Sequence, residues 1–325
     1  MKQKQIVAID VSKLSLDLCL RPVGKPFKIS NNLAGFKQLK AAIDPALEPI
    51  VVMEHTGQYS FKLEQFLQKQ GIAYCKIPAL EIKRSIGMVR GKSDKIDAKR
   101  IAEYAWLRRD QLVPTVRVEE NVLRLDQLLS LRAKLVKDCS GYKTRLKEMI
   151  FTGNCFKGDA IYKAQQVILK TFRTEIKKIE TCIEQIIAGD SGLRKNFDLI
   201  RSIKGVGKIV AAKVLAVTNN FKKFSDARKF NCYAGLAPFK HESGTSIKGR
   251  SRISHLANKE IKTLLSLAAF AAIRHNPELK NYYLKRVAEG KRKMSCINIV
   301  RAKLVTRMFA VIKRQTPYEL LVLAA

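Results

Sequence analysis

The sequence lacks several features that mark common functional classes. Its seven cysteines stand singly, with no CxxC pair and no Cys/His cluster, which argues against a zinc site or a disulfide framework and favours reduced thiols. No stretch resembles a transmembrane span or a signal peptide, so we expect a cytoplasmic protein that is not membrane-bound. A GxxxxGK[ST] phosphate-binding loop is also absent, which agrees with chemistry that needs no nucleotide cofactor.

Acidic residues are scarce beside basic ones. The 325 residues include 62 Lys and Arg against 28 Asp and Glu, a formal net charge of +34. Residues 201–325 alone carry 26 basic and 6 acidic side chains, a net charge of +20. This excess points to a polyanionic partner, and nucleic acid is a better candidate than a membrane surface. With 46% hydrophobic residues, the chain is expected to form two or three folded domains.

The first third has the pattern of an α/β domain. Short apolar or alternating runs followed by turns predict strands, and segments with apolar residues at helical spacing predict helices. The predicted strands cover residues 6–9, 14–20, 27–29, 50–53 and 72–77. The predicted helices cover residues 33–43, 59–70 and 97–106.

The rest of the chain is predicted to be mostly helical. Two long amphipathic segments, 119–149 and 162–187, are typical of an antiparallel coiled-coil hairpin. Five further helices are predicted after residue 190, with a polar loop over residues 233–256 that follows neither the helical nor the strand period. We therefore predict three parts: 1–112, 113–190 and 191–325.

Four carboxylates are placed for metal chemistry. Asp10 and Glu54 each follow a predicted buried strand, and strand ends direct side chains into a common crevice. Asp94 and Asp97 lie three residues apart at a predicted helix start, where such positions share a face. Oxygen ligands suit Mg²⁺, which can assist phosphoryl transfer. Each residue alone could instead cap a turn or helix or pair with a lysine. The ordered set of four is what a ribonuclease H-like domain would have.

A glycine-bearing turn joins two apolar helical segments in the basic part. Lys204, Gly205, Gly207 and Lys208 resemble the turn of a helix-hairpin-helix, whose backbone N–H groups can approach a DNA phosphate. A helix junction without a ligand is the structural alternative.

The polar loop that follows contains a candidate nucleophile. Ser243 precedes a glycine, with Lys248, Arg250 and Arg252 nearby to neutralise a phosphate. A serine hydroxyl can attack a phosphodiester if His241 or a metal-bound water accepts its proton. Ser246, Ser251 and Ser254 compete with it on spacing alone, and the loop could also grip phosphate without supplying a nucleophile.

Together the motifs resemble one protein family over nearly the whole chain: the DEDD transposases of bacterial insertion sequences, which are bridge-RNA-guided recombinases. The N-terminal marks of the resemblance are 8-AIDVSK-13, 53-MEHTG-57 and 92-KSDKIDA-98. The C-terminal marks are 203-IKGVG-207, 233-YAGLAP-238, 242-ESG-244, Asn276-Pro277 and Tyr282-Tyr283.

The resemblance implies a RuvC-like domain in which Asp10, Glu54, Asp94 and Asp97 bind Mg²⁺. It further implies a C-terminal transposase domain in which Ser243 forms a covalent phosphoserine with DNA. Relatives act as tetramers, and a noncoding RNA specifies donor and target DNA. The chain departs from the family at residues 255–257, His-Leu-Ala, where relatives commonly have Lys at the first position and Gly at the third. No phosphate contact is therefore carried over to His255.

The sequence thus predicts a transposase that recombines double-stranded DNA at the ends of its element and at the target. Its expected location is the bacterial nucleoid. Two alternatives remain: a RuvC-like nuclease that cuts DNA by metal-dependent hydrolysis, and an architectural protein that binds RNA or DNA without cutting it.

Overall fold

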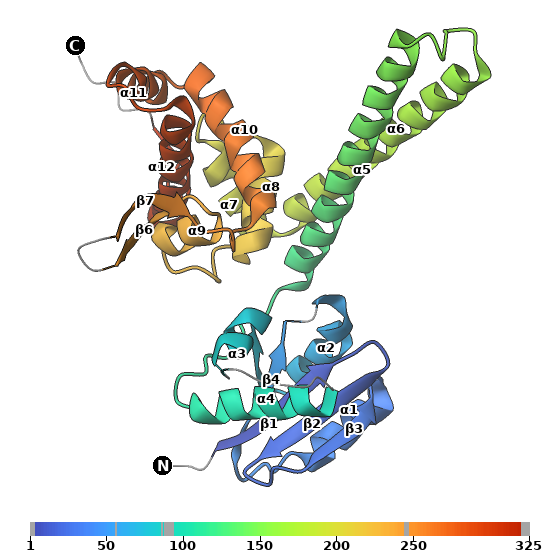
Figure 1. The fold of residues 1–325 in the computed structure, drawn as a ribbon, viewed down its shortest axis with the longest axis vertical. Coiled ribbons are helices and arrows are strands. Elements are labelled where there is room, and N and C mark those ends of the chain that lie inside the picture. Colours follow the sequence, from blue (N-terminus) through green and yellow to red (C-terminus); the bar gives the residue numbers. More distant parts are fainter. Residues whose placement is uncertain (1–3, 56, 86, 88–93, 244–246, 320–325) are drawn as a thin grey trace. The chain divides into compact units, whose positions relative to one another are not determined.

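The protein is described here by a computed structural model that covers residues 4–55, 57–85, 87, 94–243 and 247–319. For Asp94, Lys95, His241, Ser243, Ile247, Lys248 and Arg250 it describes the backbone alone. The chain divides into two compact units, residues 1–117 and 118–325 (Figure 1). The finer predicted division at residues 112 and 190 stays a prediction.

The first unit is built on a five-stranded mixed sheet with the order β3-β2-β1-β4-β5. Its strands are β1 (Lys4–Val11), β2 (Ser15–Arg21), β3 (Pro26–Ser30), β4 (Glu48–Glu54) and β5 (Ala73–Ile77). The first three pair antiparallel, whereas β4 runs parallel to β1 and β5 runs parallel to β4. The predicted strands are all present, and the α/β class of this unit is confirmed. The central strands β1 and β4 are apolar on both faces because helices cover both sides.

Helices α1 (Leu33–Ala42) and α2 (Phe61–Lys69) cover one face of this sheet, and α3 (Ala79–Ser85) and α4 (Asp94–Leu107) cover the other. Successive side chains of β1 point to opposite faces of the sheet, so this strand contributes to the hydrophobic core on each face. Val7 and Ile9 pack with α1 and α2, whereas Ile6 and Ala8 pack with α4. The even-numbered face of β1, which also includes Asp10, is therefore the face that α4 crosses (Figure 1).

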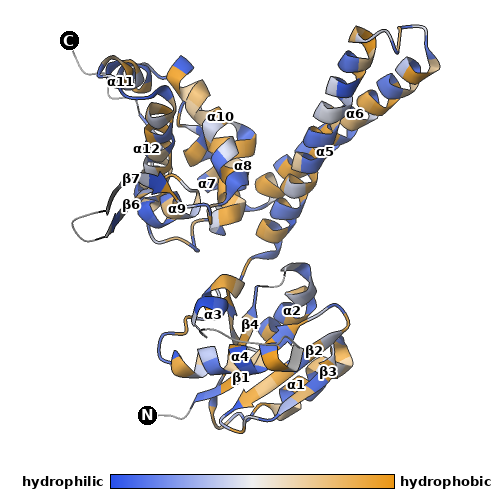
Figure 2. Cartoon of the chain, in the orientation of Figure 1, coloured by the Kyte–Doolittle hydropathy of each residue, from blue (hydrophilic) through white to orange (hydrophobic). Residues whose placement is uncertain are grey.

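The second unit begins with two long helices, α5 (Glu120–Phe151) and α6 (Ala160–Gly189), which pack against each other as an antiparallel hairpin. Hydrophobic and hydrophilic residues are interspersed along both, as in amphipathic helices (Figure 2). Leu146 and Leu169 are buried near the hairpin's connecting loop. The two predicted helices are present, while coiled-coil packing stays a prediction.

The remaining helices surround one large core, which also takes in the first turns of α5 and the last turns of α6. They are α7 (Ser191–Arg201), α8 (Lys208–Thr218), α9 (Ala227–Tyr233), α10 (Lys259–His275), α11 (Pro277–Ala288) and α12 (Lys293–Arg314). The mostly helical character predicted for this part is confirmed. Among the described residues, no helix is both long and apolar enough to cross a bilayer.

The expectation of a loop over residues 233–256 was wrong. Strands β6 (Pro238–Ser243) and β7 (Ile247–Ile253) form a two-stranded antiparallel ribbon. A register irregularity between Phe239 and His241 breaks the alternation of β6. Few of the ribbon's positions are apolar, so hydrophobic periodicity did not reveal it.

Candidate functional site

Asp10 and Glu54 occupy neighbouring positions on adjacent parallel strands. Asp10 is the next-to-last residue of β1 and Glu54 the last of β4. Ile9 pairs with Met53, so the two acidic residues come one step later on each strand and lie on the same face. Strands in a sheet are about 4.8 Å apart, which brings the two carboxylates close. Both residues are half-buried.

Asp97 comes from the helix that crosses this face. It precedes Ala98, which is fully buried against the sheet, and its carboxylate accepts a hydrogen bond from Arg100 at 2.8 Å. Asp94 is the first residue of α4, and its side chain lies outside the described residues. Among the side chains that are described, no three His, Cys, Asp or Glu gather as a metal site.

One acidic residue beside Asp10 was missed by the sequence analysis. Asp17 of β2 lies directly across from Asp10, is only 3% exposed, and pairs with Lys28 of β3 at 3.3 Å. The signal was present, because the leucines alternating along residues 14–20 leave Asp17 on the opposite face of β2 from them. Asp17 thus forms an ion pair with Lys28, so the position across from Asp10 holds a paired carboxylate.

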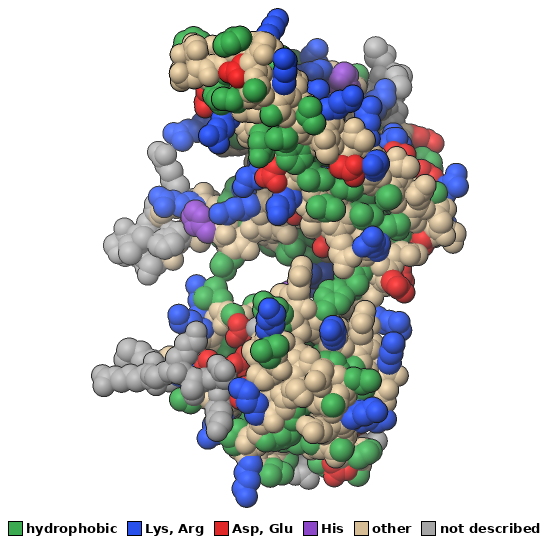
Figure 3. All heavy atoms as spheres, turned by 90° about the vertical axis from the view of Figure 1, so that its right-hand side faces the viewer, with side chains coloured by type: hydrophobic (Ala, Val, Ile, Leu, Met, Phe, Trp, Pro, Cys, Tyr) green, Lys and Arg blue, Asp and Glu red, His purple; other side chains and the backbone are tan. Residues whose placement is uncertain are grey.

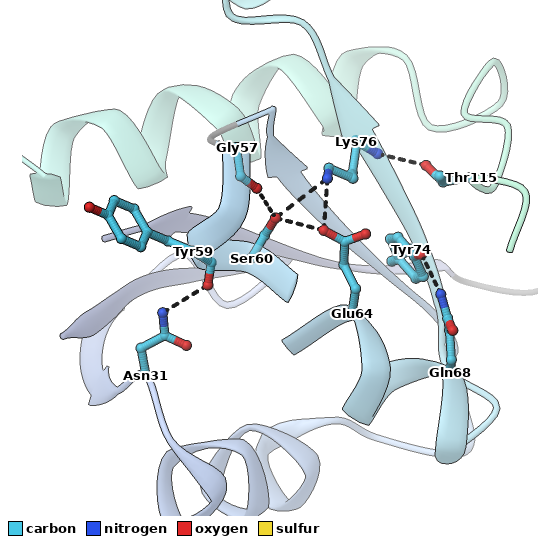
Figure 4. A network of polar contacts seen from close by, with 9 residues as sticks. All are labelled: Asn31, Gly57, Tyr59, Ser60, Glu64, Gln68, Tyr74, Lys76 and Thr115. Atoms are coloured by element: carbon cyan, nitrogen blue, oxygen red, sulfur yellow. Dashed lines mark hydrogen bonds and ion pairs between the residues drawn. The ribbon is translucent and has the colours of Figure 1, made fainter. Parts of the chain in front are cut away.

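A buried polar network holds the chain that leaves Glu54 (Figure 4). Ser60, fully buried, donates to the carbonyl of Gly57 at 3.2 Å and lies 2.6 Å from a carboxylate oxygen of Glu64. Lys76 of β5 approaches the same carboxylate at 2.7 Å, and both members of this ion pair are largely buried. The turn after Glu54 is therefore fastened to both α2 and β5.

Asn31 links the two chain segments that follow the strand-end carboxylates. Its side-chain amide donates to the carbonyl of Ser12, just after β1, at 2.8 Å and to the carbonyl of Tyr59 at 3.1 Å. The second of these bonds is drawn in Figure 4. One amide group thus fixes the segments after Asp10 and Glu54 relative to each other.

The candidate nucleophile lies at the end of a strand in the second unit. Ser243 is the last residue of β6 and pairs with Ile247 across residues 244–246, and its side chain lies outside the described residues. Ser246 also lies outside them. Ser251 is exposed on β7, while Ser254 accepts a hydrogen bond from the backbone N–H of Leu256 at 3.2 Å and so has a structural role.

The three basic residues expected near this serine alternate along β7. Arg252 is exposed and pairs in register with Phe239 of β6, which is 49% exposed. The side chains of Lys248 and Arg250 lie outside the described residues. Lys and Arg side chains are spread widely over the face drawn in Figure 3, as expected for a nucleic-acid-binding protein.

The base of the ribbon is held by specific packing. Gly235 has a φ of +66°, and a Cβ there would lie 2.3 Å from the methyl group of Ala257. Tyr233 is tied to Asn258 by a backbone hydrogen bond and by a contact between their side chains, both 2.9 Å. The methyl group of Ala257 therefore lies directly against Gly235.

The glycine turn between α7 and α8 has a clear packing role. Gly205 has a φ of +100°, and a Cβ there would come within 2.6 Å of the Cα of Ala272 in α10. Gly207 precedes α8, and a Cβ there would meet nothing within 4 Å. Lys204 is exposed, and Lys208 pairs with Glu184 of α6 at 2.6 Å. Gly205 thus has a role in helix packing, and the nucleic-acid contacts of all four residues stay a prediction.

Comparison with known proteins finds family matches to two successive parts of the chain. A model of DEDD transposases matches residues 7–152, and a model of the transposase IS116/IS110/IS902 family matches residues 197–284. Together these matches cover more than half of the chain, and their order is that of the motifs in the sequence. The chain belongs to the IS116/IS110/IS902 family of DEDD transposases.

Individual relatives extend over almost the full length. The chain is 26% identical to a pilin gene-inverting protein of Moraxella lacunata over 97% of this chain and 98% of the relative. It is 24% identical to the transposase for insertion sequence element IS1111A of Coxiella burnetii, over 98% and 92% of the two chains. Among solved structures, T. thermophilus RuvC in complex with a Holliday junction substrate matches 35% of this chain at 11% identity with a TM-score of 0.25.

Proposed function

We propose that this protein excises and inserts its insertion sequence by strand exchange, with Ser243 as the nucleophile. Family membership supports transposition, and the position of Ser243 supports its role. The serine ends β6 beside residues 244–246, in the part of the chain that carries most of the net positive charge. Among the competing serines that are described, Ser254 already accepts a structural hydrogen bond.

The proposed step conserves the energy of the phosphodiester bond. The Ser243 oxygen bonds to phosphorus while the bond from phosphorus to the leaving deoxyribose oxygen breaks. The hydroxyl proton passes to a base, for which His241 or a water molecule is available, and the leaving oxygen takes up a proton. Attack by the hydroxyl of another strand reverses the step and restores the serine, so no nucleotide cofactor is needed.

The acidic residues of the first unit fit a divalent cation, for which we propose Mg²⁺. Asp10 and Glu54 supply hard oxygen donors from adjacent strands, and Asp97 and Asp94 come from the first turn of the helix on that face. A bound cation would neutralise phosphate charge and lower the pKa of water. The chain's contribution is to hold these carboxylates in place through Asn31 and the Ser60–Glu64–Lys76 network. The strand order, with three antiparallel strands continued by two parallel ones, supports a ribonuclease H-like domain.

The partners are proposed from the family resemblance. We propose double-stranded DNA at the element ends and target, a noncoding bridge RNA that selects them, and a tetramer of this chain. The net charge of +34 supports binding to nucleic acid. The proposed helix-hairpin-helix contacts are those of Lys204, Gly205, Gly207 and Lys208. The proposed ribbon contacts are those of Lys248, Arg250 and Arg252.

The decisive experiment seeks a covalent protein–DNA adduct. Protein is mixed with element-junction DNA, the flanking noncoding RNA and Mg²⁺, quenched in denaturant and run on a denaturing gel. Wild type and Ser251→Ala, which changes an exposed serine on the opposite strand, are expected to form the adduct, and Ser243→Ala is expected to form none.

Other outcomes identify the alternatives. Cut DNA without an adduct, unchanged by Ser243→Ala but abolished by Asp10→Asn, would identify a hydrolytic nuclease instead. Tight, salt-sensitive binding without cleavage under any divalent metal would identify an architectural protein.

A further inference from the structure

Among the described residues of the second unit, two cationic side chains are buried in the core, and their surroundings differ. Lys213 of α8 is 3% exposed, and its ammonium lies 3.0 Å from both Asp126 of α5 and Glu260 of α10. Burial alone would lower the pKa of Lys213, but the two carboxylates outweigh it and raise the pKa. Lys213 is therefore a satisfied structural cation.

Arg301 of α12 is buried to the same degree but has no such partner. It is 5% exposed, and none of the described carboxylates lies within ion-pair distance of it. Within the part of the chain that the structure describes, its guanidinium donates one hydrogen bond, to the side-chain oxygen of Asn298 at 3.3 Å, and its Nε has no hydrogen-bond partner. A buried charge in this state is costly unless an anion compensates it.

A second cation, Lys262, is on α10, a helix that packs against α12. Burial and the charge of Arg301 both lower the pKa of Lys262 of α10. Burial likewise lowers the pKa of Arg301, although an arginine stays protonated at neutral pH. Lys262 is partly exposed and Arg301 is 5% exposed, so an anion would approach from the side of Lys262. Two adjacent cations, one with an unused donor, are arranged as a receptor for an anion.

The position of this pair connects it to the ribbon. Asn298 accepts from Arg301 and at the same time donates to the carbonyl of Leu236 at 2.8 Å, two residues before β6. One asparagine thus links the unpaired guanidinium to the base of the strand that ends at Ser243. Any anion held by Arg301 and Lys262 lies close to the base of the ribbon.

We propose that Arg301 and Lys262 bind a backbone phosphate of the DNA strand that lies along ribbon β6–β7. The proposal rests on the function proposed above in taking DNA as the ligand. The six residues of β6 span about 17 Å from Pro238 to Ser243, so this phosphate is not the one that the serine attacks. At about 3.4 Å per nucleotide, the bound phosphate lies roughly five nucleotides from the phosphate that Ser243 attacks. Arg301 and Lys262 are therefore positioning residues that set the register of the strand.

The test compares full-length Arg301→Met with two matched variants. Lys213→Met removes the buried cation that has partners, and Arg314→Met removes an exposed charge from the end of the same helix. Melting temperatures are measured in chloride and in inorganic phosphate at equal ionic strength, and affinity is measured for a labelled junction duplex and for RNA of the same sequence.

We expect Arg301→Met to melt no lower than wild type in chloride, because an unpaired buried charge is removed, whereas Lys213→Met melts lower. Inorganic phosphate should raise the melting temperature of wild type but not of Arg301→Met. The affinity of Arg301→Met for the duplex should fall at least about 30-fold, and that of Arg314→Met much less. In Lys262→Met, which changes a partly exposed residue, inorganic phosphate should also fail to raise the melting temperature. This variant provides the test if Arg301→Met does not fold.

The proposal is overturned if Arg301→Met or Lys262→Met responds to phosphate as wild type does and binds the duplex as Arg314→Met does. Loss of RNA affinity alone would overturn the assignment to DNA. If phosphate stabilises wild type through Arg301 but Ser243 forms no adduct, the anion site stands and the recombinase proposal fails.

Discussion

The two regions that carry the candidate chemistry are supported in opposite ways. In the first unit, Asp10 and Glu54 extend from strands whose other residues are almost all buried. The chain after each of them is fixed by side-chain hydrogen bonds. In the second unit, Ser243 lies at the end of a two-stranded ribbon whose residues are mostly exposed where they are described. The base of that ribbon is anchored in the helical core through the carbonyl of Leu236.

This difference matches what the two chemistries require. A cation site depends on oxygen atoms held at fixed separations, and such precision comes from side chains on packed strands with a supporting shell of hydrogen bonds. A nucleophile that must reach phosphates in a large, flexible polymer gains from a support that extends from the core. Substitutions in the two regions should therefore have different effects on activity and on stability.

The largest effect is expected at the strand-end carboxylates. Asp10→Asn should lower Mg²⁺-dependent DNA cleavage at least about a thousandfold with little change in melting temperature, because it removes a charged ligand and keeps the shape. Asp17→Asn, which changes the residue directly across the sheet, should lower the free energy of unfolding by about 1 kcal/mol and keep most of the activity. Cleavage assays with thermal denaturation measure both. If Asp17→Asn abolishes cleavage without loss of stability, Asp17 belongs to the cation site.

The next largest effect is expected at the glycine turn and separates its two interpretations. Gly205→Ala should lower the free energy of unfolding by about 3 kcal/mol, since the new methyl group meets the backbone of α10 and the φ of +100° disfavours a side chain. Gly207→Ala should change it by less than about 1 kcal/mol, because nothing lies near the added atom.

Urea denaturation together with DNA affinity decides between these interpretations. A stable Gly207→Ala protein with weakened DNA binding would establish the turn as a phosphate contact. A stable protein with normal affinity would leave the turn a structural junction.

The sequence predicted the first unit well and the ribbon poorly, for physical reasons. Buried strands have runs of apolar residues in the sequence. The sequence therefore predicts β1 and β4 directly, with Asp10 and Glu54 at their ends. The ribbon has no such signal, because its residues are mostly polar and an irregularity near Phe239 interrupts the alternation. Tertiary partners such as Lys76 with Glu64 depend on how the elements pack, which local patterns do not encode.

The burial of Arg301 can be predicted from the sequence. It lies four residues after Ile297 and three before Leu304, both of which are buried, so helical spacing alone puts it on the apolar face of α12. What the spacing could not tell is whether a carboxylate from another helix meets it there, as happens to Lys213.

The smallest effect on cleavage is expected at Asn31. A substitution there tests whether cleavage depends on holding Asp10 and Glu54 at a fixed separation. Asn31→Ala removes both hydrogen bonds that join the segments after Asp10 and Glu54, so cleavage should fall about tenfold and need more Mg²⁺. The matched control is Asn32→Ala, which removes the N-cap of α1, where the side chain accepts from the N–H of Gly35. Both variants should lose about 1 kcal/mol of stability, but only Asn31→Ala should lose activity. Equal activity in the two, measured across a Mg²⁺ titration, would mean that the carboxylates keep their positions without this link and that the sheet alone fixes them.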